Sequence, residues 1–331
     1  MTSLLLGIVL AASPARPPAF ELHALGVLGG DTDGNLSCFL LGAPGEPPVL
    51  MIDGGSVAPG LRRWLEKRGV LASNASPTVQ AKAMREALRP VRALLLTHAH
   101  LDHWGGFVDM TTLDFELAAE GKPSMQVVGL PQALEALRDE VFHGPLWADF
   151  TKLPAKNPAL VLQPLAPGQR LELAPFQVED VLLHHAVPSA AFLVRRGAQA
   201  YLHLGDTGAT QAVWELARPL LRAHQLHAIS LEMSYGPGDE KLAALTGHLA
   251  RNSFLLELAK LAEVPPPAGV AMSQSEALAL ATRLAPFFRD CPVIVIHVKA
   301  LSYDAVKREV AALKAAGLNV ILPEQGGSYR L

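Results

Sequence analysis

Short hydrophobic runs, separated by turns rich in Gly and Asp, begin at about residue 20. They read ELHALGV, SCFLL and VLMID, at residues 21–27, 37–41 and 49–53. This pattern predicts short strands joined by tight turns. A further run, VRALLLT at residues 91–97, is apolar without polar alternation. It predicts a strand that is buried on both faces.

Helical and strand-like spacing then alternate to the end of the chain. Strands are predicted at residues 124–130, 192–196, 201–206, 227–232, 292–298 and 318–322. Helices are predicted at residues 61–68, 79–88, 131–142, 252–261 and 304–316. No clean linker interrupts this alternation, and we find no internal repeat. The pattern favours one α/β domain of layered sheets over residues 20–331.

The N-terminus differs from the rest of the chain. Residues 4–12 are apolar, and small residues follow them, which is typical of a secretory signal peptide. We therefore expect residues 1–19 to be a signal peptide and a short tail, and the mature protein to be periplasmic or secreted. No Lys or Arg precedes the apolar run, so a mis-assigned start and a cytoplasmic protein are the alternative. No later stretch has 18 uninterrupted apolar residues, which argues against stable membrane association.

Composition narrows the function classes. Half of the residues are hydrophobic and 18% are charged, which excludes a disordered chain. Lys and Arg number 28 against 31 Asp and Glu, without a long basic block, which argues against nucleic-acid binding. The two cysteines are too few for a disulfide framework or a zinc ribbon. The oligomeric state is left open.

Four potential metal ligands fall within six residues directly after the apolar run at 91–97. They are His98, His100, Asp102 and His103. In an extended segment His98 and His100 project to the same side and can reach one cation, whereas the other two can reach a second. Imidazole and carboxylate without thiolate favour zinc, with manganese or iron as alternatives. The motif therefore predicts two divalent metal ions. Polar residues in a surface turn are the alternative, and they rarely occur at this density.

The sequence THAHLDH resembles the signature of the metallo-β-lactamase superfamily. This resemblance implies an αββα sandwich, an α/β fold of two mixed β-sheets flanked by helices, with a dinuclear metal site at one sheet edge. It also implies ligands at His185, Asp206 and His297. His185 is favoured over His184 because similar sequences place a small residue after the ligand. One metal would bind His98, His100 and His185, and the other Asp102, His103 and His297, with Asp206 shared. Taken singly, each of the later ligands could be a core or turn residue.

Residues outside the metal set resemble the class II cyclic-nucleotide phosphodiesterases of that superfamily. The most telling pair is LEMSY at 231–235 followed by TGHL at 246–249, and the resemblance runs from about residue 20 to the final strand. It implies hydrolysis of 3',5'-cyclic AMP, with cyclic GMP as a second substrate, to the 5'-monophosphate. Met233, His143 and Ala250-Arg251 depart from the family pattern and put the nucleotide preference in doubt.

The expected reaction assigns roles to three residues. A hydroxide held by the metals would attack phosphorus, and the leaving 3'-oxygen needs a proton. We expect His248 to be the general acid, with Glu232 orienting its ring and raising its pKa. Asp102 is the third expected catalytic residue. The structural alternatives are a packing role for His248 and a strand-end ion pair for Glu232.

The purine base needs its own contacts. Phe142 and Trp147 are candidates to stack on it, although aromatic residues at this spacing are more often part of a core. Asp31, Thr32 and Asn35 could line the ribose-phosphate side, or simply form a turn.

Two other functions compete with the phosphodiesterase hypothesis. One is hydrolysis of a different ester, such as an arylsulfate, a lactone or another phosphodiester. The other is a non-catalytic periplasmic protein that binds nucleotide or metal. The intact HxHxDH motif argues against this last alternative, and the expected partner is a small-molecule cyclic nucleotide.

Overall fold

Two mixed β-sheets pack face to face at the centre of the protein. The computed structural model describes residues 16–30, 32–267 and 271–331. The first sheet has the spatial order β16 (Ser328–Arg330), β1 (Glu21–Gly26), β3 (Cys38–Gly42), β4 (Leu50–Gly54), β5 (Ala93–Leu96), β6 (Met125–Gly129) and β7 (Leu160–Pro164). The second has the order β15 (Val320–Ile321), β13 (Val293–Ile296), β12 (Leu226–Glu232), β11 (Gln199–Leu204), β10 (Ser189–Arg196), β9 (Phe176–Leu183) and β8 (Arg170–Leu173). A short parallel pair joins β2 (Leu28–Gly29) to β14 (Val298–Lys299).

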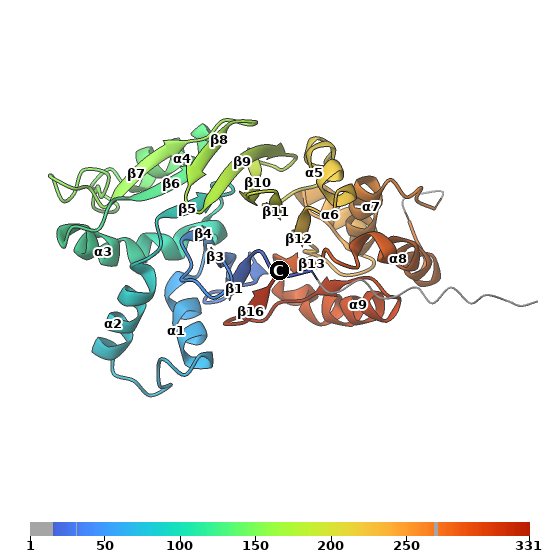
Figure 1. Ribbon diagram of the computed structural model, residues 1–331, viewed down its shortest axis with the longest axis horizontal. Coiled ribbons are helices and arrows are strands. Elements are labelled where there is room, and N and C mark those ends of the chain that lie inside the picture. Colours follow the sequence, from blue (N-terminus) through green and yellow to red (C-terminus); the bar gives the residue numbers. More distant parts are fainter. Residues whose placement is uncertain (1–15, 31, 268–270) are drawn as a thin grey trace, which may run out of the picture.

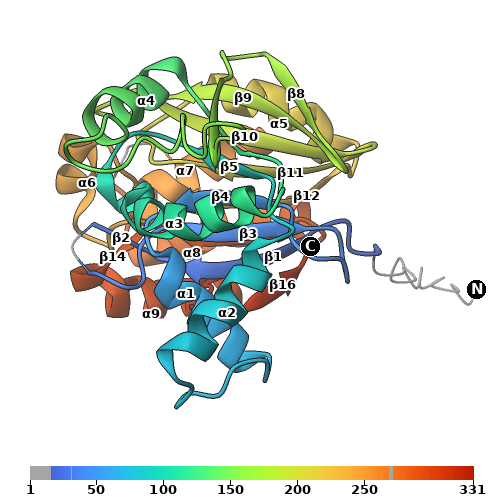
Figure 2. The same ribbon diagram turned by 90° about the vertical axis from the view of Figure 1, so that its left-hand side faces the viewer.

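Helices cover the outer side of each sheet, as Figures 1 and 2 show. The first group is α1 (Val57–Lys67), α2 (Pro77–Leu88), α3 (Gly105–Ala119) and α4 (Pro131–Ala136), and the second is α5 (Ala212–Arg222), α6 (Glu240–Thr246), α7 (Arg251–Ala262), α8 (Gln274–Phe288) and α9 (Tyr303–Ala315). Short turns of other helix types are η1 (Leu101–His103), η2 (Leu137–Val141) and η3 (Ala300–Ser302). The predicted αββα arrangement is confirmed.

The apolar strands of the first sheet divide their side chains between two cores. On β5, Ala93 and Leu95 join the core between the sheets, whereas Leu94 and Leu96 join the core under α1 and α3. Successive side chains of a strand point to opposite faces, so a strand covered on both faces must be apolar at every position. This explains why the run at 91–97 lacks polar alternation.

Most of the predicted elements are present. The predicted helix at 131–142 consists of α4, with Pro131 in its first turn, followed by the π-helical η2. The helices α3, α5, α6 and α8 and the strands β2, β7, β8, β9 and β16 were not predicted. They include three of the four outermost strands, β16, β7 and β8, whose half-exposed residues carry a weaker hydrophobic pattern.

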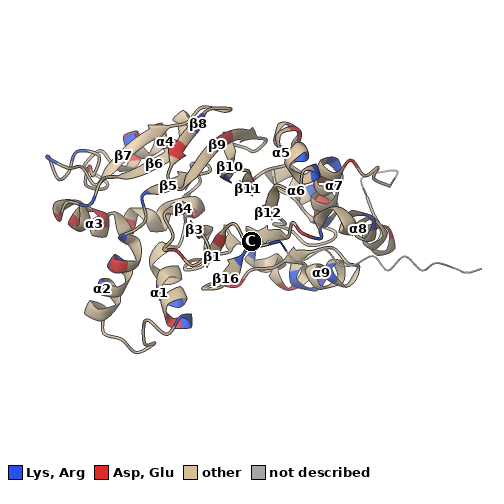
Figure 3. Cartoon of the chain, in the orientation of Figure 1, with Lys and Arg blue, Asp and Glu red and all other residues tan. Residues whose placement is uncertain are grey.

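The expected signal peptide cannot be compared with the structure, because residues 1–15 lie outside the described residues. It and the domain boundary at residue 20 stay predictions. Within the described part of the chain, no helix has the length and apolar character that crossing a membrane requires. Lys and Arg residues alternate with Asp and Glu on the outer helices, for example on α1, α2 and α9 (Figure 3).

One carboxyl group lies in the interior without a partner. Asp180, on β9, is fully buried, and within the described chain neither of its carboxylate oxygens has a hydrogen-bond partner. Burial raises the pKa of Asp180 to about 7, because the charged form loses its hydration. The folded protein therefore holds a proton that the unfolded chain releases at lower pH.

This proton makes the stability depend on pH. The contribution of Asp180 to the free energy of unfolding is fully present below its ordinary pKa of 3.8. It is lost as the pH rises through its raised pKa of about 7. We expect Asp180→Asn to raise the free energy of unfolding by up to about 4 kcal/mol at about pH 8.5, with little change at about pH 4. Urea unfolding of variant and parent at each pH measures this. The exposed Asp109→Asn is the control, and equal shifts at both pH values would contradict the assignment.

Candidate metal centre

Seven side chains from five segments converge at one edge of the two sheets. The loop after β5 and the turn η1 carry the HxHxDH residues. His185 follows β9, Asp206 follows β11, and His297 follows β13. Since β11, β12 and β13 are parallel, their carboxyl ends reach the same edge. The sheet topology therefore brings together residues that are as much as 199 positions apart, from position 98 to position 297.

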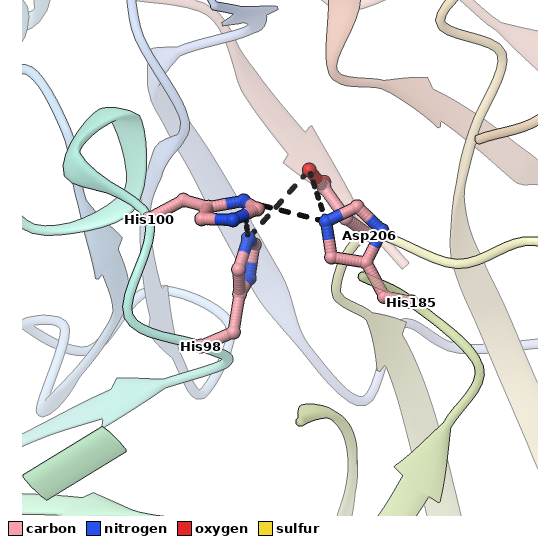
Figure 4. A group of neighbouring side chains, drawn as sticks. All are labelled: His98, His100, His185 and Asp206. Carbon is pink, nitrogen blue, oxygen red and sulfur yellow. Dashed lines mark hydrogen bonds and ion pairs between the residues drawn. The ribbon is translucent and has the colours of Figure 1, made fainter. Parts of the chain in front are cut away.

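The first ligand group contains His98, His100, His185 and Asp206, whose ligand atoms all lie within 4.8 Å of one another (Figure 4). His100 Nδ1 lies 3.1 Å from His98 Nε2 and 3.3 Å from His185 Nε2. Asp206 Oδ2 lies 3.7 Å from His98 Nε2 and 3.9 Å from His185 Nε2. Three nitrogens and one oxygen around a common point are a donor set that suits a divalent cation.

The second ligand group contains Asp102, His103 and His297, again within 4.8 Å of one another. His297 Nε2 lies 3.2 Å from Asp102 Oδ2 and 3.2 Å from Asp206 Oδ2. The other oxygen of Asp206, Oδ1, lies 3.4 Å from His103 Nε2. Asp206 thus contacts both groups, and these two groups contain the same residues as the two expected metal sites. A third group, which overlaps them, consists of Asp206, His248 and His297.

In His103 and His185, hydrogen bonds hold one ring nitrogen so that the other nitrogen faces the cluster. His103 donates from Nδ1 to Asp53 Oδ2 (2.7 Å), and His185 donates from Nδ1 to the Gly247 carbonyl (2.9 Å). His103 Nε2 is buried and has no hydrogen-bond partner among the described residues. Such bonds orient metal-binding imidazoles and fix their tautomers. The residues present therefore fit divalent metal ions.

The charges of the cluster favour ionised carboxylates. Burial opposes the ionisation of Asp206, but the neighbouring imidazoles of His297 and His103 outweigh it and hold the pKa of Asp206 well below its usual range. The pKa of Asp102 is also lowered: burial raises it, but the hydrogen bond with His297 and the charges of His103 and His297 together outweigh burial. Burial and the charge of His103 lower the pKa of His98 well below its usual value. Asp206, Asp102 and His98 are thus held in the forms that bind cations.

Asp53 supports the cluster and was missed by the sequence analysis. Its carboxylate accepts hydrogen bonds from the Thr97 backbone N–H (2.9 Å), the Thr97 hydroxyl (2.9 Å) and the His103 ring. Asp53 is buried and has a φ of 52°, a conformation that few non-glycine residues adopt. The available signal was a carboxylate ending the apolar strand VLMID.

Glycines allow the chain to approach His297. A Cβ on Gly29 would lie 2.3 Å from the His297 ring, so no side chain fits there. The next residue, Gly30, donates its backbone N–H to Asp102 Oδ2 at 2.7 Å. His297 itself has a φ of 55°. The pairing of β2 with β14 thus places Gly29 and Gly30 against the second ligand group.

The expected acid and its partner are in contact. His248 Nδ1 lies 3.1 Å from Glu232 Oε2, and Glu232 is fully buried. Burial lowers the pKa of His248, but the Glu232 carboxylate more than offsets this, and the pKa of His248 is raised above its ordinary value. His248 also lies near the cluster, with Nδ1 3.8 Å from Asp206 Oδ2.

Glu232 connects this histidine to a candidate metal ligand. It accepts hydrogen bonds from the Thr207 backbone N–H (2.7 Å) and from the Ser234 hydroxyl. Ser234 Oγ in turn lies 3.0 Å from His297 Nδ1 and can accept a hydrogen bond from it, which leaves His297 Nε2 facing the cluster. One carboxylate therefore orients both His248 and, through Ser234, His297.

The remaining candidates from the sequence do not belong to the ligand groups. His184 is exposed and lies outside the ligand groups, so the structure places His185 at the cluster. The stacking candidate Phe142 is wrong, because it is 1% exposed in the core under α3. Trp147 packs against the same core and donates its ring N–H to Thr111. Asn35 accepts from the Val27 backbone N–H, a turn role, and Asp31 lies outside the described residues.

Comparison with known proteins identifies the family. The model of the beta-lactamase superfamily domain matches residues 59–250, more than half of the chain. The chain belongs to the beta-lactamase superfamily. The solved structure of unliganded yeast PDE1 superposes with a TM-score of 0.72 at 20% identity, covering 95% of this chain and 100% of that chain. This superposition supports the superfamily fold.

Two curated relatives of this superfamily member cover nearly the whole chain. A "Probable 3',5'-cyclic-nucleotide phosphodiesterase" from Yersinia pestis is 27% identical over 94% of this chain and 89% of the relative. A "3',5'-cyclic-nucleotide phosphodiesterase" from Aliivibrio fischeri is 25% identical over 96% of this chain and 94% of the relative.

The neighbouring histidines His184 and His185 offer a matched test of the ligand assignment. We expect His185→Ala to lose about half of the bound metal, because it removes a nitrogen from the first ligand group. We expect His184→Ala to keep its full metal content. Elemental analysis of both purified variants measures this. Metal loss at position 184 with retention at 185 would reverse the assignment.

Proposed function

We propose that the protein is a metal-dependent 3',5'-cyclic-nucleotide phosphodiesterase that hydrolyses cyclic AMP, and also cyclic GMP, to the 5'-monophosphate. The observation that carries the proposal is the contact between His248 and Glu232 beside a cluster with two ligand groups. The cluster suits a phosphodiester, and the paired histidine suits protonation of a leaving oxygen. The names of the two relatives that cover the chain support the same substrate class.

Two divalent ions, zinc by preference, would be held by the residues of the cluster. His98, His100 and His185 would hold one, Asp102, His103 and His297 the other, and Asp206 would contact both. When bound, such ions lower the pKa of water and neutralise charge on the phosphoryl oxygens. Asp53 and Ser234 would hold His103 and His297 in the orientation that binding needs.

His248 would supply a proton to the 3'-oxygen. The raised pKa keeps its imidazole protonated to higher pH than usual, and Glu232 stabilises the charged ring. His248 Nε2 makes no hydrogen bond to any described residue, so this nitrogen is available to a substrate. When the ring gives up its proton, the Glu232 carboxylate keeps it oriented for the next turnover.

The roles of His248 and Asp206 are separable. We expect His248→Ala to keep the metal content and lower kcat by about 10²- to 10⁴-fold, because a general acid contributes that much. We expect Asp206→Ala to lose metal and activity together, since Asp206 contacts both ligand groups. Elemental analysis with steady-state kinetics on cyclic AMP measures both. Equal metal loss in the two variants would show that His248 is a ligand instead.

The substrate class is tested by comparing esters. We expect the metal-loaded protein to convert cyclic AMP to AMP, and to act at least about 100-fold less efficiently on an arylsulfate or a lactone, because the site is built for a phosphodiester. Chromatographic product analysis identifies the monophosphate. Faster turnover of another ester would favour the alternative hydrolase, and binding of cyclic AMP without release of AMP would favour a binding protein.

A further inference from the structure

A pocket of about 540 Å³ lies beside the second ligand group. Gly30 forms part of its wall and holds Asp102 through a 2.7 Å hydrogen bond. Lys299, also in the wall, follows His297 by two residues. Tyr235 lines the pocket too, and its ring centroid lies 6.1 Å from that of His248. The pocket thus borders both the cluster and the expected acid. Its volume falls within the range of small-molecule sites.

Lys299 brings a positive charge to this pocket. A Cβ on Gly30 would lie 3.0 Å from Lys299 Nζ, so the lysine side chain extends along the Gly30 backbone. Lys299 is half-buried and forms no ion pair with any carboxylate of the described residues. An ammonium group next to a site for divalent cations is electrostatically unfavourable unless an anion lies between them. Phosphate is an anion that lysine binds well.

The rest of the pocket lining includes three residues with apolar surface, together with the polar residues Asp239 and Ser302. Tyr235, Leu242 and Leu301 line it, and the two leucines are 45% and 96% exposed. Single exposed leucines are common, but here two of them share one pocket with an aromatic ring. A nucleobase has apolar faces that stack on such side chains. Phosphate-binding and base-binding chemistry therefore occur side by side.

We propose that this pocket is the nucleotide subsite, in which Lys299 binds a non-bridging phosphate oxygen and Tyr235, Leu242 and Leu301 hold the base. This inference rests on the proposed function and names the residues that would give it nucleotide affinity. Lys299 acts here in binding and takes no proton from the substrate. The subsite would equally hold the 5'-monophosphate product.

Calorimetric titration of metal-loaded protein with 5'-AMP and with adenosine tests the two halves of the subsite. We expect Lys299→Met to weaken AMP binding at least about tenfold and adenosine binding less than about twofold, because only AMP carries the phosphate. We expect Lys299→Arg to retain most of the AMP affinity. Leu301→Ser should weaken both ligands alike, by about threefold or more.

Controls separate these effects from general damage. Lys307→Met removes an exposed lysine from α9, and Val79→Ser removes an exposed apolar side chain from α2, so both should bind as the parent does. Metal content is measured for every variant. Unchanged AMP binding in Lys299→Met would overturn the phosphate assignment. Equal loss of AMP and adenosine binding in that variant would also overturn it.

Failure of the subsite proposal can be distinguished from failure of the proposed function. If cyclic AMP is hydrolysed but the pocket variants bind AMP as the parent does, the subsite is wrong and the activity stands. If AMP binds with the expected pattern while no cyclic nucleotide is hydrolysed, the subsite stands and the activity is wrong. An absence of adenosine binding to the parent would overturn the base-binding half.

Discussion

A carboxylate buried among imidazoles is the interaction on which this structure depends. Asp206 is 2% exposed, and its oxygens lie within 4 Å of His98, His103, His185 and His297. A buried charge needs compensating positive charge close by, whether protons on the rings or metal ions. Packing of the two sheets at this edge brings the carboxylate and the compensating rings together. Folding of the edge and assembly of the site are therefore coupled.

The supporting hydrogen bonds explain how so many rings keep one orientation. Asp53 holds His103, the Gly247 carbonyl holds His185, and Ser234 holds His297. Each partner uses the nitrogen that faces away from the cluster. Glu232 joins this shell to His248, so loss of that carboxylate would remove the shared hydrogen-bond partner of His248 and Ser234. Hydrogen bonds therefore connect His248, through Glu232 and Ser234, to His297 in the cluster.

The sequence predicted the parts of this site that have local signatures. The HxHxDH motif and the apolar run before it were enough to expect a cation site, and the family resemblance supplied His185, Asp206 and His297. Asp53 and Ser234 were missed because each acts through another residue, and no spacing in the sequence records that contact. Phe142 was misjudged because sequence does not reveal which side of a helix end faces the core. Lys299 was not singled out because only the structure shows that its side chain lies beside Gly30.

The left-handed backbone at Asp53 and His297 has a consequence for the evolution of the protein. Their φ angles of 52° and 55° lie in the left-handed region, which glycine adopts without strain. For other residues this conformation costs on the order of 1 kcal/mol. Selection for stability alone would favour glycine at both positions. The imidazole and the carboxylate at these positions are therefore expected only where their contacts with the cluster offset this cost, as the hydrogen bond from His103 to Asp53 and the contact of His297 with Asp206 do here.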